Sequence, residues 1–224
     1  MSLSSDKIEI EGLVTRTLDN LALTITSKSA REGANMRQQI GEVRANYARY
    51  IKNGTFMQEM LDCFTAAKDA NVPLMGLAYV REQLFLEEPD GDIAKAIVQA
   101  SIGFCLSAES YLITQLEFNS RIDIEALMKR MTAAFNTARD LAADAEDASF
   151  YQNLTWLSGA LISYLATTSR PLPQMVRFDL PTSLPALTLS NRIYYTAERW
   201  EELVDENKTI HPAFCQRQVV GLAS

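Results

Sequence analysis

The side chains best suited to nucleophilic or metal chemistry in this chain are one histidine, His211, and three cysteines, Cys63, Cys105 and Cys215. A catalytic histidine works with a nucleophile and an orienting acid, and a structural zinc ion takes about four Cys or His ligands. One histidine and widely spaced cysteines do not form such a set, and the proline after His211 is typical of a tight turn. We therefore expect a structural His211, reduced thiols, and no catalytic residue, metal or cofactor; the chain is predicted not to be an enzyme.

Two groups of charged side chains could bind a ligand. The carboxylates between Glu87 and Asp92 do not have the glycine and distal glutamate spacing of a calcium loop, so we interpret them as a solvated turn. Arginines spread over residues 31–49 could contact phosphates, but Glu32 and Glu42 interrupt them, which is typical of a solvated helix face. The sequence contains no Walker loop, Gly-x-Gly-x-x-Gly or Gly-x-Ser-x-Gly motif.

The overall charge argues against a nucleic-acid partner. The 224 residues include 28 acidic and 21 basic side chains, so the formal net charge is −7. A dedicated duplex-DNA binder needs a basic face that displaces counterions, and this balance disfavours one. The hydrophobic share of 47% is enough for one domain with a full core, or for a body with a small appended module.

Apolar residues recur at helical spacing through most of the chain. One stripe, at spacings of three and four, is formed by Met36, Ile40, Val43, Tyr47 and Tyr50. Gly54 is predicted to end this helix, because glycine tolerates a left-handed turn. Pro73 is predicted to open a later helix, and Asp92 is predicted to be the N-cap of another. Similar stripes continue to Leu165, so we expect helix over more than half of the chain.

The most apolar stretch runs from Ile93 to Phe118. It contains Lys95, Glu109 and other polar side chains, so we predict a buried core helix and no membrane span. Because this helix is apolar nearly all round, it should lie at the centre of a bundle.

Proline changes the pattern after residue 170. Pro171, Pro173, Pro181 and Pro185 lie within fifteen residues, so this segment cannot be one helix. We predict a mainly α protein in three parts: an N-terminal segment 1–30 that fits either a strand or a helix, a helical bundle 31–169, and a C-terminal part 170–224. That last part should hold an extended arm around residues 175–180 and a hairpin of two short helices around 185–195 and 197–207.

The segment from Leu184 to Phe214, LPALTLSNRIYYTAERWEELVDENKTIHPAF, resembles the C-terminal end of the DNA-circularisation (or DNA-circulation) protein family of Mu-like phages and prophages. That family typically ends with a Leu-Pro-x-Leu helix, an Arg-(Leu/Ile)-Tyr step, an Arg-x-x-Glu-Leu helix, an Asn and a His-Pro-x-Phe sequence. The matching residues here are Leu184-Pro185-Ala186-Leu187, Arg192-Ile193-Tyr194, Arg199-Trp200-Glu201-Glu202-Leu203, Asn207 and His211-Pro212-Ala213-Phe214. The similarity is clear over about the last ninety residues.

The same region is similar to the LysM-like pattern of phage baseplate proteins, in which Tyr-Gly-Asp, a short helix, Asn and Pro recur. Tyr195 and Thr196 stand here where Gly and Asp are usual, so the turn chemistry must differ. Thr196 can still cap the second helix of the hairpin. Family members usually carry an N-terminal domain to which the name attaches, and nothing in this sequence corresponds to it. The circularisation activity is therefore not carried over.

The resemblance implies a structural component of a bacteriophage or prophage tail, at the baseplate hub or tail tip. Its expected partners are other tail proteins and copies of itself in a ring, and its expected location is the virion tail after assembly in the host cytoplasm. The predicted interface residues lie in the C-terminal hairpin and turn: Ile193, Tyr194, Arg199, Trp200, Leu203, Val204, His211 and Phe214. Two alternatives stay open, a LysM-like peptidoglycan-binding module and a DNA-end-handling (circularisation) factor.

The apolar face of the hairpin needs a cover. A helix of about ten residues is not stable alone in water, so this face should be buried on the chain's own bundle or on another subunit. Tyr194 and Trp200 are of the residue types enriched at interface hot spots, which favours another subunit.

Overall fold

The computed structural model describes residues 3–26, 30–172 and 175–222, and most of them are helical. The elements follow in the order α1 (Leu3–Leu23), α2 (Ala30–Asn53), α3 (Phe56–Asp69), α4 (Leu74–Phe85), α5 (Asp92–Thr114), α6 (Arg121–Asp144), α7 (Ala148–Ser169), β1 (Met175–Asp179), α8 (Ala186–Tyr194), α9 (Trp200–Glu206) and β2 (Gln218–Leu222). The prediction of a mainly α protein is confirmed.

The chain divides into two compact units whose boundaries differ from the expected ones. The helical unit comprises residues 1–116 and 131–161, and the C-terminal unit comprises residues 117–130 and 162–224. The first part of α6 and the last part of α7 therefore belong with the C-terminal unit. Periodicity alone could not indicate this division, because both helices continue through it without a break.

The N-terminal segment is helical and belongs to the helical unit. Ile10, Val14 and Leu21 are buried on one side of α1, whereas Ile8 is exposed. Ile8 and Ile10 alternate with polar residues, as in a strand, but they lie in a helix and only Ile10 faces the core. The helical spacing of the longer set of apolar residues predicts the observed element, because α1 packs on α2, α4 and α5.

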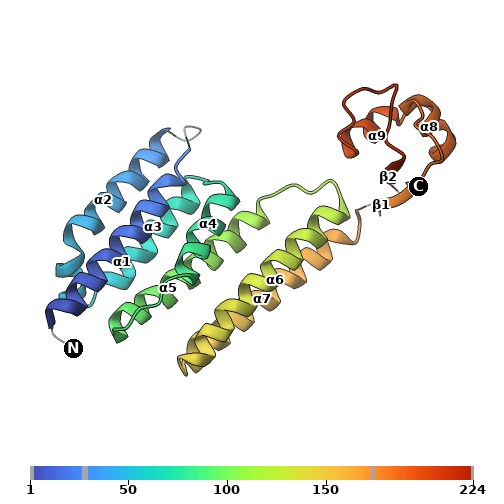
Figure 1. The fold of residues 1–224 in the computed structure, drawn as a ribbon. Coiled ribbons are helices and arrows are strands. Elements are labelled where there is room, and N and C mark those ends of the chain that lie inside the picture. The colour runs from blue at the N-terminus through green and yellow to red at the C-terminus, as the bar shows by residue number, and fades with distance from the viewer. Residues whose placement is uncertain (1–2, 27–29, 173–174, 223–224) are drawn as a thin grey trace. The chain divides into compact units, whose positions relative to one another are not determined.

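Helix α5 lies at the centre of the helical unit, as predicted, and contacts α1, α3 and α4 (Figure 1). Its apolar residues, Ile97, Ile102, Leu106 and Ile113 among them, are buried. Among the described residues α5 is also a helix long and apolar enough to cross a membrane, but 61% of its most apolar window is buried inside the protein. A core helix passes the same test of length and composition, so the packing favours the core interpretation.

A buried ion pair joins α4 to α5. Arg81 Nε donates to Glu109 Oε1 at 2.8 Å, and both side chains are almost inaccessible to water. The Arg81 guanidinium also lies over the ring of Phe85, 5.5 Å from its centroid. Because removing charges from water costs several kcal/mol per ion, a packing of α4 on α5 that separated these two side chains would be disfavoured.

The predicted helix ends at Gly54 and Pro73 are confirmed, and the predicted N-cap of α5 is displaced by one residue. Gly54 follows α2 with a φ of +74°, and Pro73 precedes α4. Asp92 does not cap α5; it is the first residue of that helix, and Gly91 is the N-cap. Glu9 of α1 accepts hydrogen bonds from the backbone N–H groups of Asp90 and Gly91, so a carboxylate from another helix satisfies donors beside this helix start.

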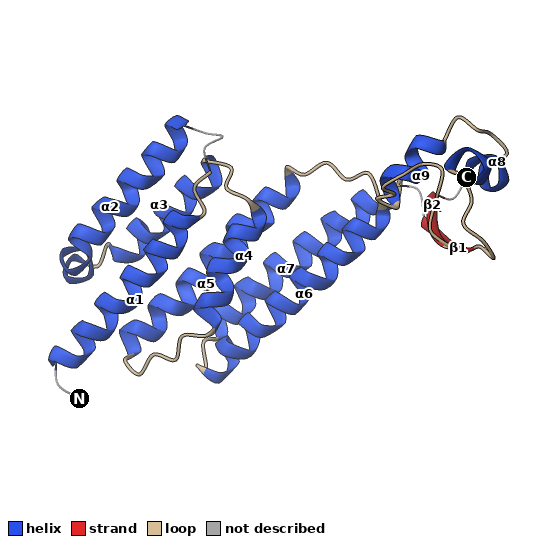
Figure 2. Cartoon of the chain, turned by 45° about the horizontal axis from the view of Figure 1, so that its top comes forward, coloured by secondary structure: helices blue, strands red, loops and turns tan. Residues whose placement is uncertain are grey.

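The C-terminal unit contains a module of strand, helix, helix and strand, which we call the C-terminal module (residues 175–222). The strands β1 and β2 pair antiparallel, with Val176 opposite Gly221 and Phe178 opposite Val219 (Figure 2). Here β1 is the predicted extended arm, and α8 and α9 are the predicted hairpin. Strand β2 pairs with the arm and closes the module, and it was not predicted from the sequence.

Candidate interaction surface of the C-terminal module

The C-terminal module has a small core of its own. Its buried residues are Ala186, Leu189, Leu203, Cys215 and Val219. Partly buried side chains pack against them, and these include Leu180, Ile193, Tyr194, Trp200 and Val204. The expectation that the hairpin face is covered by the bundle or by another subunit is therefore corrected, because β2 and the segment around Cys215 cover it.

This packing separates the predicted interface residues into two groups. Leu203 is 1% exposed and offers no surface to a partner. Ile193, Trp200 and Val204 are only partly exposed and pack against the core. His211 and Phe214 are exposed and lie outside the core, so a partner can reach them.

Tyr194, Arg199 and Glu202 form a closed polar cluster at the edge of this core. Arg199 donates two hydrogen bonds to the Glu202 carboxylate, at 2.8 and 2.9 Å, and these bonds raise the pKa of the guanidinium. The guanidinium carbon lies 3.9 Å from the centroid of the Tyr194 ring, and the Tyr194 hydroxyl donates to Glu202. The predicted interface residues Tyr194 and Arg199 therefore stabilise the hairpin itself.

Asn207 joins the end of α9 to strand β2. Its amide nitrogen donates to the Val220 carbonyl and its amide oxygen accepts from the Val220 N–H, both at 2.7 Å. The same nitrogen donates to the Leu203 carbonyl at 2.8 Å. One side chain thus replaces the partner strand that Val220 lacks on this side, which gives the motif asparagine a structural reason.

The turn between α8 and α9 keeps a left-handed residue without glycine. Tyr195, at the usual glycine position of the LysM-like pattern, has a φ of +58° and is exposed. The buried Ser190 hydroxyl donates to the Thr196 carbonyl at 2.7 Å and fixes this turn. The Thr196 hydroxyl accepts from Glu198 within the turn; the N-cap of α9 is Arg199, so the predicted helix cap at Thr196 is wrong.

Backbone hydrogen bonds hold the two loops of the module together. The Cys215 N–H donates to the Leu184 carbonyl at 3.0 Å, and the Ala186 N–H donates to the Pro212 carbonyl at 2.7 Å. The Ser183 hydroxyl donates to the Cys215 carbonyl. The start of α8 and the turn at residues 211–214 therefore lie side by side.

The first turn of α8 and the adjoining turn at residues 210–214 expose large apolar side chains. The Ile210 side chain is fully exposed, Phe214 is 71% exposed, and Leu187 is more than half exposed. The His211 ring lies 5.8 Å from the Phe214 ring, and its Nδ1 accepts from the Ala213 N–H. We call Leu187, Ile210, His211 and Phe214 the His-Pro-Ala-Phe surface. Sequence reasoning missed Ile210 and Leu187; an isoleucine beside a proline turn with no helix to bury it was the available signal.

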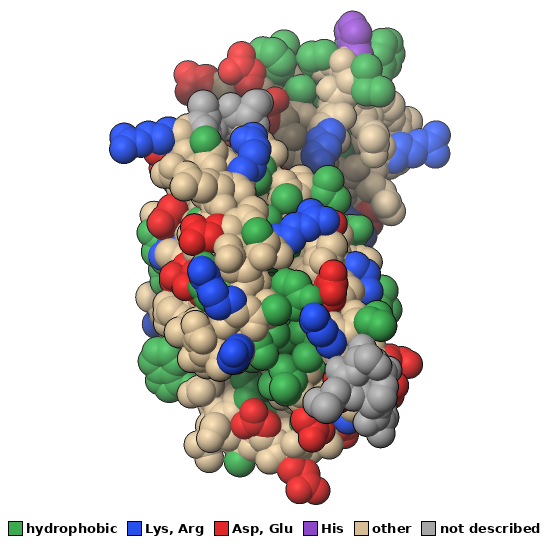
Figure 3. Space-filling view, turned by 90° about the vertical axis from the view of Figure 1, so that its left-hand side faces the viewer, with side chains coloured by type: hydrophobic (Ala, Val, Ile, Leu, Met, Phe, Trp, Pro, Cys, Tyr) green, Lys and Arg blue, Asp and Glu red, His purple; other side chains and the backbone are tan. Residues whose placement is uncertain are grey.

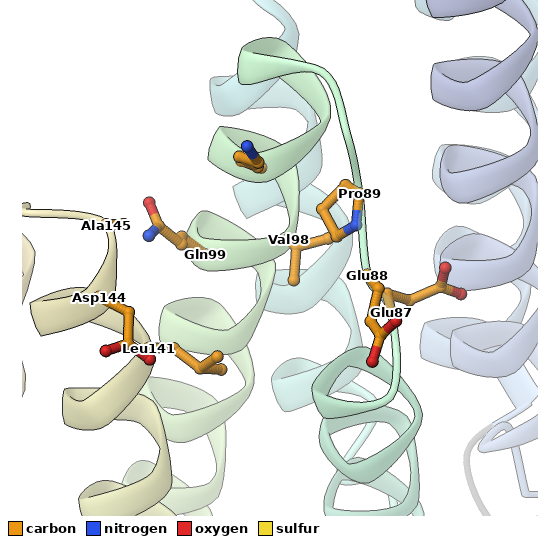
Figure 4. A pocket seen from close by; sticks show the side chains of 9 residues that line it. Glu87, Glu88, Pro89, Val98, Gln99, Leu141, Asp144 and Ala145 are labelled. Carbon is orange, nitrogen blue, oxygen red and sulfur yellow. The ribbon is translucent and has the colours of Figure 1, made fainter.

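The helical unit has a hollow of about 320 Å³ beside the turn at residues 87–89. Figure 4 shows Leu141 reaching from α6 toward α5, and Gln99 of α5 reaching toward the end of α6 that carries Asp144. Glu87 is already paired with Arg16 of α1, at 2.6 Å. Carboxylates, Lys95 and apolar side chains line the hollow, and neither a histidine nor a cysteine is among its lining residues.

The side chains that could do chemistry are dispersed and mostly buried. Within residues 3–26, 30–172 and 175–222, no group of three His, Cys, Asp or Glu side chains is placed to hold a metal ion. Burial raises the pKa of Cys63 to about 12, and it raises those of Cys105 and Cys215 as well. All three thiols are buried and free, and they pack as small apolar groups.

Charges of both signs are interspersed on the face of the molecule drawn in Figure 3, where Lys and Arg side chains alternate with Asp and Glu around apolar side chains. A nucleic-acid site usually gathers basic groups along one stripe. No known family model and no curated protein matches this sequence.

Proposed function

We propose that this chain is a structural component of a bacteriophage or prophage tail, at the baseplate hub or tail tip, and belongs to the DNA-circularisation family of Mu-like phages. It acts through protein–protein interfaces with other tail proteins and with copies of itself. Its C-terminal module binds a neighbouring tail protein through the His-Pro-Ala-Phe surface.

One observation carries this proposal. The family-typical segments at Leu184, Tyr194, Arg199 and Asn207 each have a role inside the C-terminal module, in its loops, its polar cluster or its strand contact. The His-Pro-Ala-Phe turn is different, because it leaves Phe214 and the preceding Ile210 in water. Exposed large apolar side chains gathered on adjoining loops are typical of protein-binding surfaces.

The test is incorporation into tail particles. The double variant Ile210→Asp/Phe214→Asp changes two exposed side chains, so its thermal midpoint should stay near that of the wild type. We expect it to fold normally and to be lost from purified particles of the prophage that encodes the chain.

The matched control is Tyr195→Asn, which removes another exposed aromatic ring from the same module. Asparagine tolerates the left-handed backbone at this position, so the module should remain folded. This control should enter particles at the wild-type level. Wild-type incorporation of the double variant would reject the surface, and absence of the wild-type chain from particles would reject the tail function.

A LysM-like peptidoglycan-binding module is the second candidate. One observation favours it: the backbone is left-handed at Tyr195, where the pattern has glycine, and the short helix α9 and Asn207 follow as in the pattern. Sedimentation with purified cell-wall glycan separates the candidates. We expect the chain to stay in the supernatant; co-sedimentation that is lost in the Ile210→Asp/Phe214→Asp variant would support the glycan function instead.

The DNA-end-handling alternative has a separate test. At a net charge of −7, duplex binding at physiological salt should be weaker than the roughly 10⁻⁴–10⁻⁶ M that is typical of non-specific binders. A fluorescence titration with duplex DNA measures it. Micromolar affinity with a steep salt dependence would support the DNA-handling function.

A further inference from the structure

Helix α7 has an exposed face without charge. Its 22 residues, Ala148–Ser169, include no Asp, Glu, Lys or Arg, although 22% of the whole chain is charged. Within the helical unit its buried side chains include Leu154 and Leu161. The exposed residues at spacings of three and four form what we call the α7 outer face: Gln152, Thr155, Trp156, Gly159 and Ala160. A solvated helix face usually carries charged side chains, so this face has the composition of a packing surface.

The largest group on the α7 outer face is an indole. Trp156 is 75% exposed, and tryptophan is among the residues most enriched at interface hot spots. The hydroxyl of the neighbouring Thr155 donates to the Tyr151 carbonyl at 2.9 Å, so its proton is already used within the helix. Gly159 and Ala160 carry no side-chain hydrogen-bonding group, so the polar demands of this face on a partner come from Gln152 and the indole N–H of Trp156.

Gly159 has no explanation inside the chain. A Cβ atom placed there would meet nothing within 4 Å, whereas one placed at Gly103 of α5 would lie 2.9 Å from the Phe150 ring. A glycine in a helix costs about 0.5–1 kcal/mol relative to alanine. Next to Trp156, a missing side chain provides a flat place where the backbone of another helix can approach closely.

The charge of the chain indicates which partner fits this face. Two copies carry a formal net charge of −7 each, so they repel one another wherever carboxylates meet. In a two-fold contact the same surface patch of both copies meets, so a patch without charge avoids that repulsion. A partner of opposite charge would instead be attracted to the charged faces of the chain.

We propose that the α7 outer face binds the same face of a second copy of this chain, with Trp156 packed over Gly159 of the partner helix. This inference deepens the proposed function, because it names where copies of the chain meet. The dimer is tested with the purified full chain, so a negative result would reject the dimer and leave the proposed tail function unaffected. The incorporation test with tail particles can fail independently of the dimer.

Sedimentation velocity of the full chain is the first experiment. A single helix face buries less than the roughly 800 Å² per partner of a standard interface. We therefore expect a reversible dimer with a dissociation constant between about 1 µM and 1 mM. Trp156→Glu places like charges together in the dimer and should weaken association at least tenfold. Ile8→Glu is the matched control, because Ile8 is 72% exposed in mid-helix on α1, and it should associate like the wild type.

A pair of glycine variants separates association from folding. Gly159→Leu and Gly41→Leu each replace a mid-helix glycine that has open space around it, so both should raise the thermal midpoint. Only Gly159→Leu should weaken the dimer, because its side chain blocks close approach of the second helix. A purely structural role for Gly159 would leave the dimer unchanged.

Three results would overturn the inference. The first is a wild-type chain that stays monomeric up to about 1 mM. The second is a Gly159→Leu variant that associates like the wild type. The third is a dimer that Ile8→Glu weakens as much as Trp156→Glu does. A disulfide dimer of Ala160→Cys under mild oxidation would support the contact, since all three native thiols are buried.

Discussion

The helical unit and the C-terminal module are stabilised in different ways. In the helical unit, long helices bury apolar stripes around α5, and the buried polar pair Arg81–Glu109 fixes the match of two faces. The module has only a few buried side chains, and side chains such as Asn207 and Ser190 bond directly to its backbone. A small core leaves more of the stability to specific hydrogen bonds, so the two regions should respond to different substitutions.

The largest effect should come from breaking the buried ion pair. Arg81→Met leaves the Glu109 carboxylate buried without its guanidinium partner, and it should lower the free energy of unfolding by about 3–5 kcal/mol. Chemical denaturation measures this loss. The double variant Arg81→Met/Glu109→Leu should lose clearly less than the sum of the single variants, because it removes the buried carboxylate together with its guanidinium partner. Additive losses would mean that the pair is not coupled.

In the module, the largest effect should come from Asn207. Asn207→Leu removes three hydrogen bonds to Leu203 and Val220 and should destabilise the module by about 2 kcal/mol. Hydrogen exchange resolves the two regions: backbone amides of β1 and β2 should exchange faster, while those of α5 keep their protection. Equal acceleration in both regions would contradict the separation drawn here.

Two glycine substitutions should have opposite signs in the two regions. A Cβ at Gly221 of β2 would lie 2.5 Å from the Tyr194 hydroxyl and 3.3 Å from Leu203, so Gly221→Ala should destabilise the module by about 1–2 kcal/mol. Gly41→Ala in α2 meets nothing within 4 Å and should stabilise the helical unit by about 0.5–1 kcal/mol. Thermal melts of the two variants check the signs, and a gain for Gly221→Ala would show that β2 is loosely packed.

The smallest effect is a pH dependence in the C-terminal unit. Desolvation, together with the charges of Asp123, Glu202 and Asp205, raises the pKa of Glu206 above its ordinary value. An acid whose pKa is higher in the folded state loses stability as the pH rises from its unfolded pKa through its folded pKa. Glu206→Gln should therefore raise the thermal midpoint at about pH 7 and leave it nearly unchanged at about pH 3. The exposed Glu198→Gln is the control, and a larger gain at the lower pH would reverse the sign.

The difference between the regions also decides what the sequence can predict. Stripes such as Met36, Ile40 and Val43 are local, so they predicted helices whose inward faces the structure confirms. The core position of α5 followed from its composition alone. By contrast, β2 is five residues long and forms a strand by pairing with β1, where the partners Phe178 and Val219 are 41 positions apart in the sequence. Short pairings of distant segments leave little local signal.

The candidate surface was predictable only in part. His211 and Phe214 stood out through the resemblance to the DNA-circularisation family, and both are exposed. Leu203 and Trp200 share a helical face, and the sequence could not tell whether a partner or the module's own strand covers it. Strand β2 can cover this face because Gly221 has no side chain. Tyr194 and Leu203 fill the space that a side chain would take there. The roles of Trp156 and Gly159 emerge only when the buried side of α7 is known.

A reconstruction of the assembled tail particle tests the central claim most directly. We predict several copies of this chain near the tail tip, with Ile210 and Phe214 of each copy buried against a neighbouring tail protein. Particles that lack the chain, or that contain it with both side chains facing solvent, would contradict the proposal that this surface carries assembly.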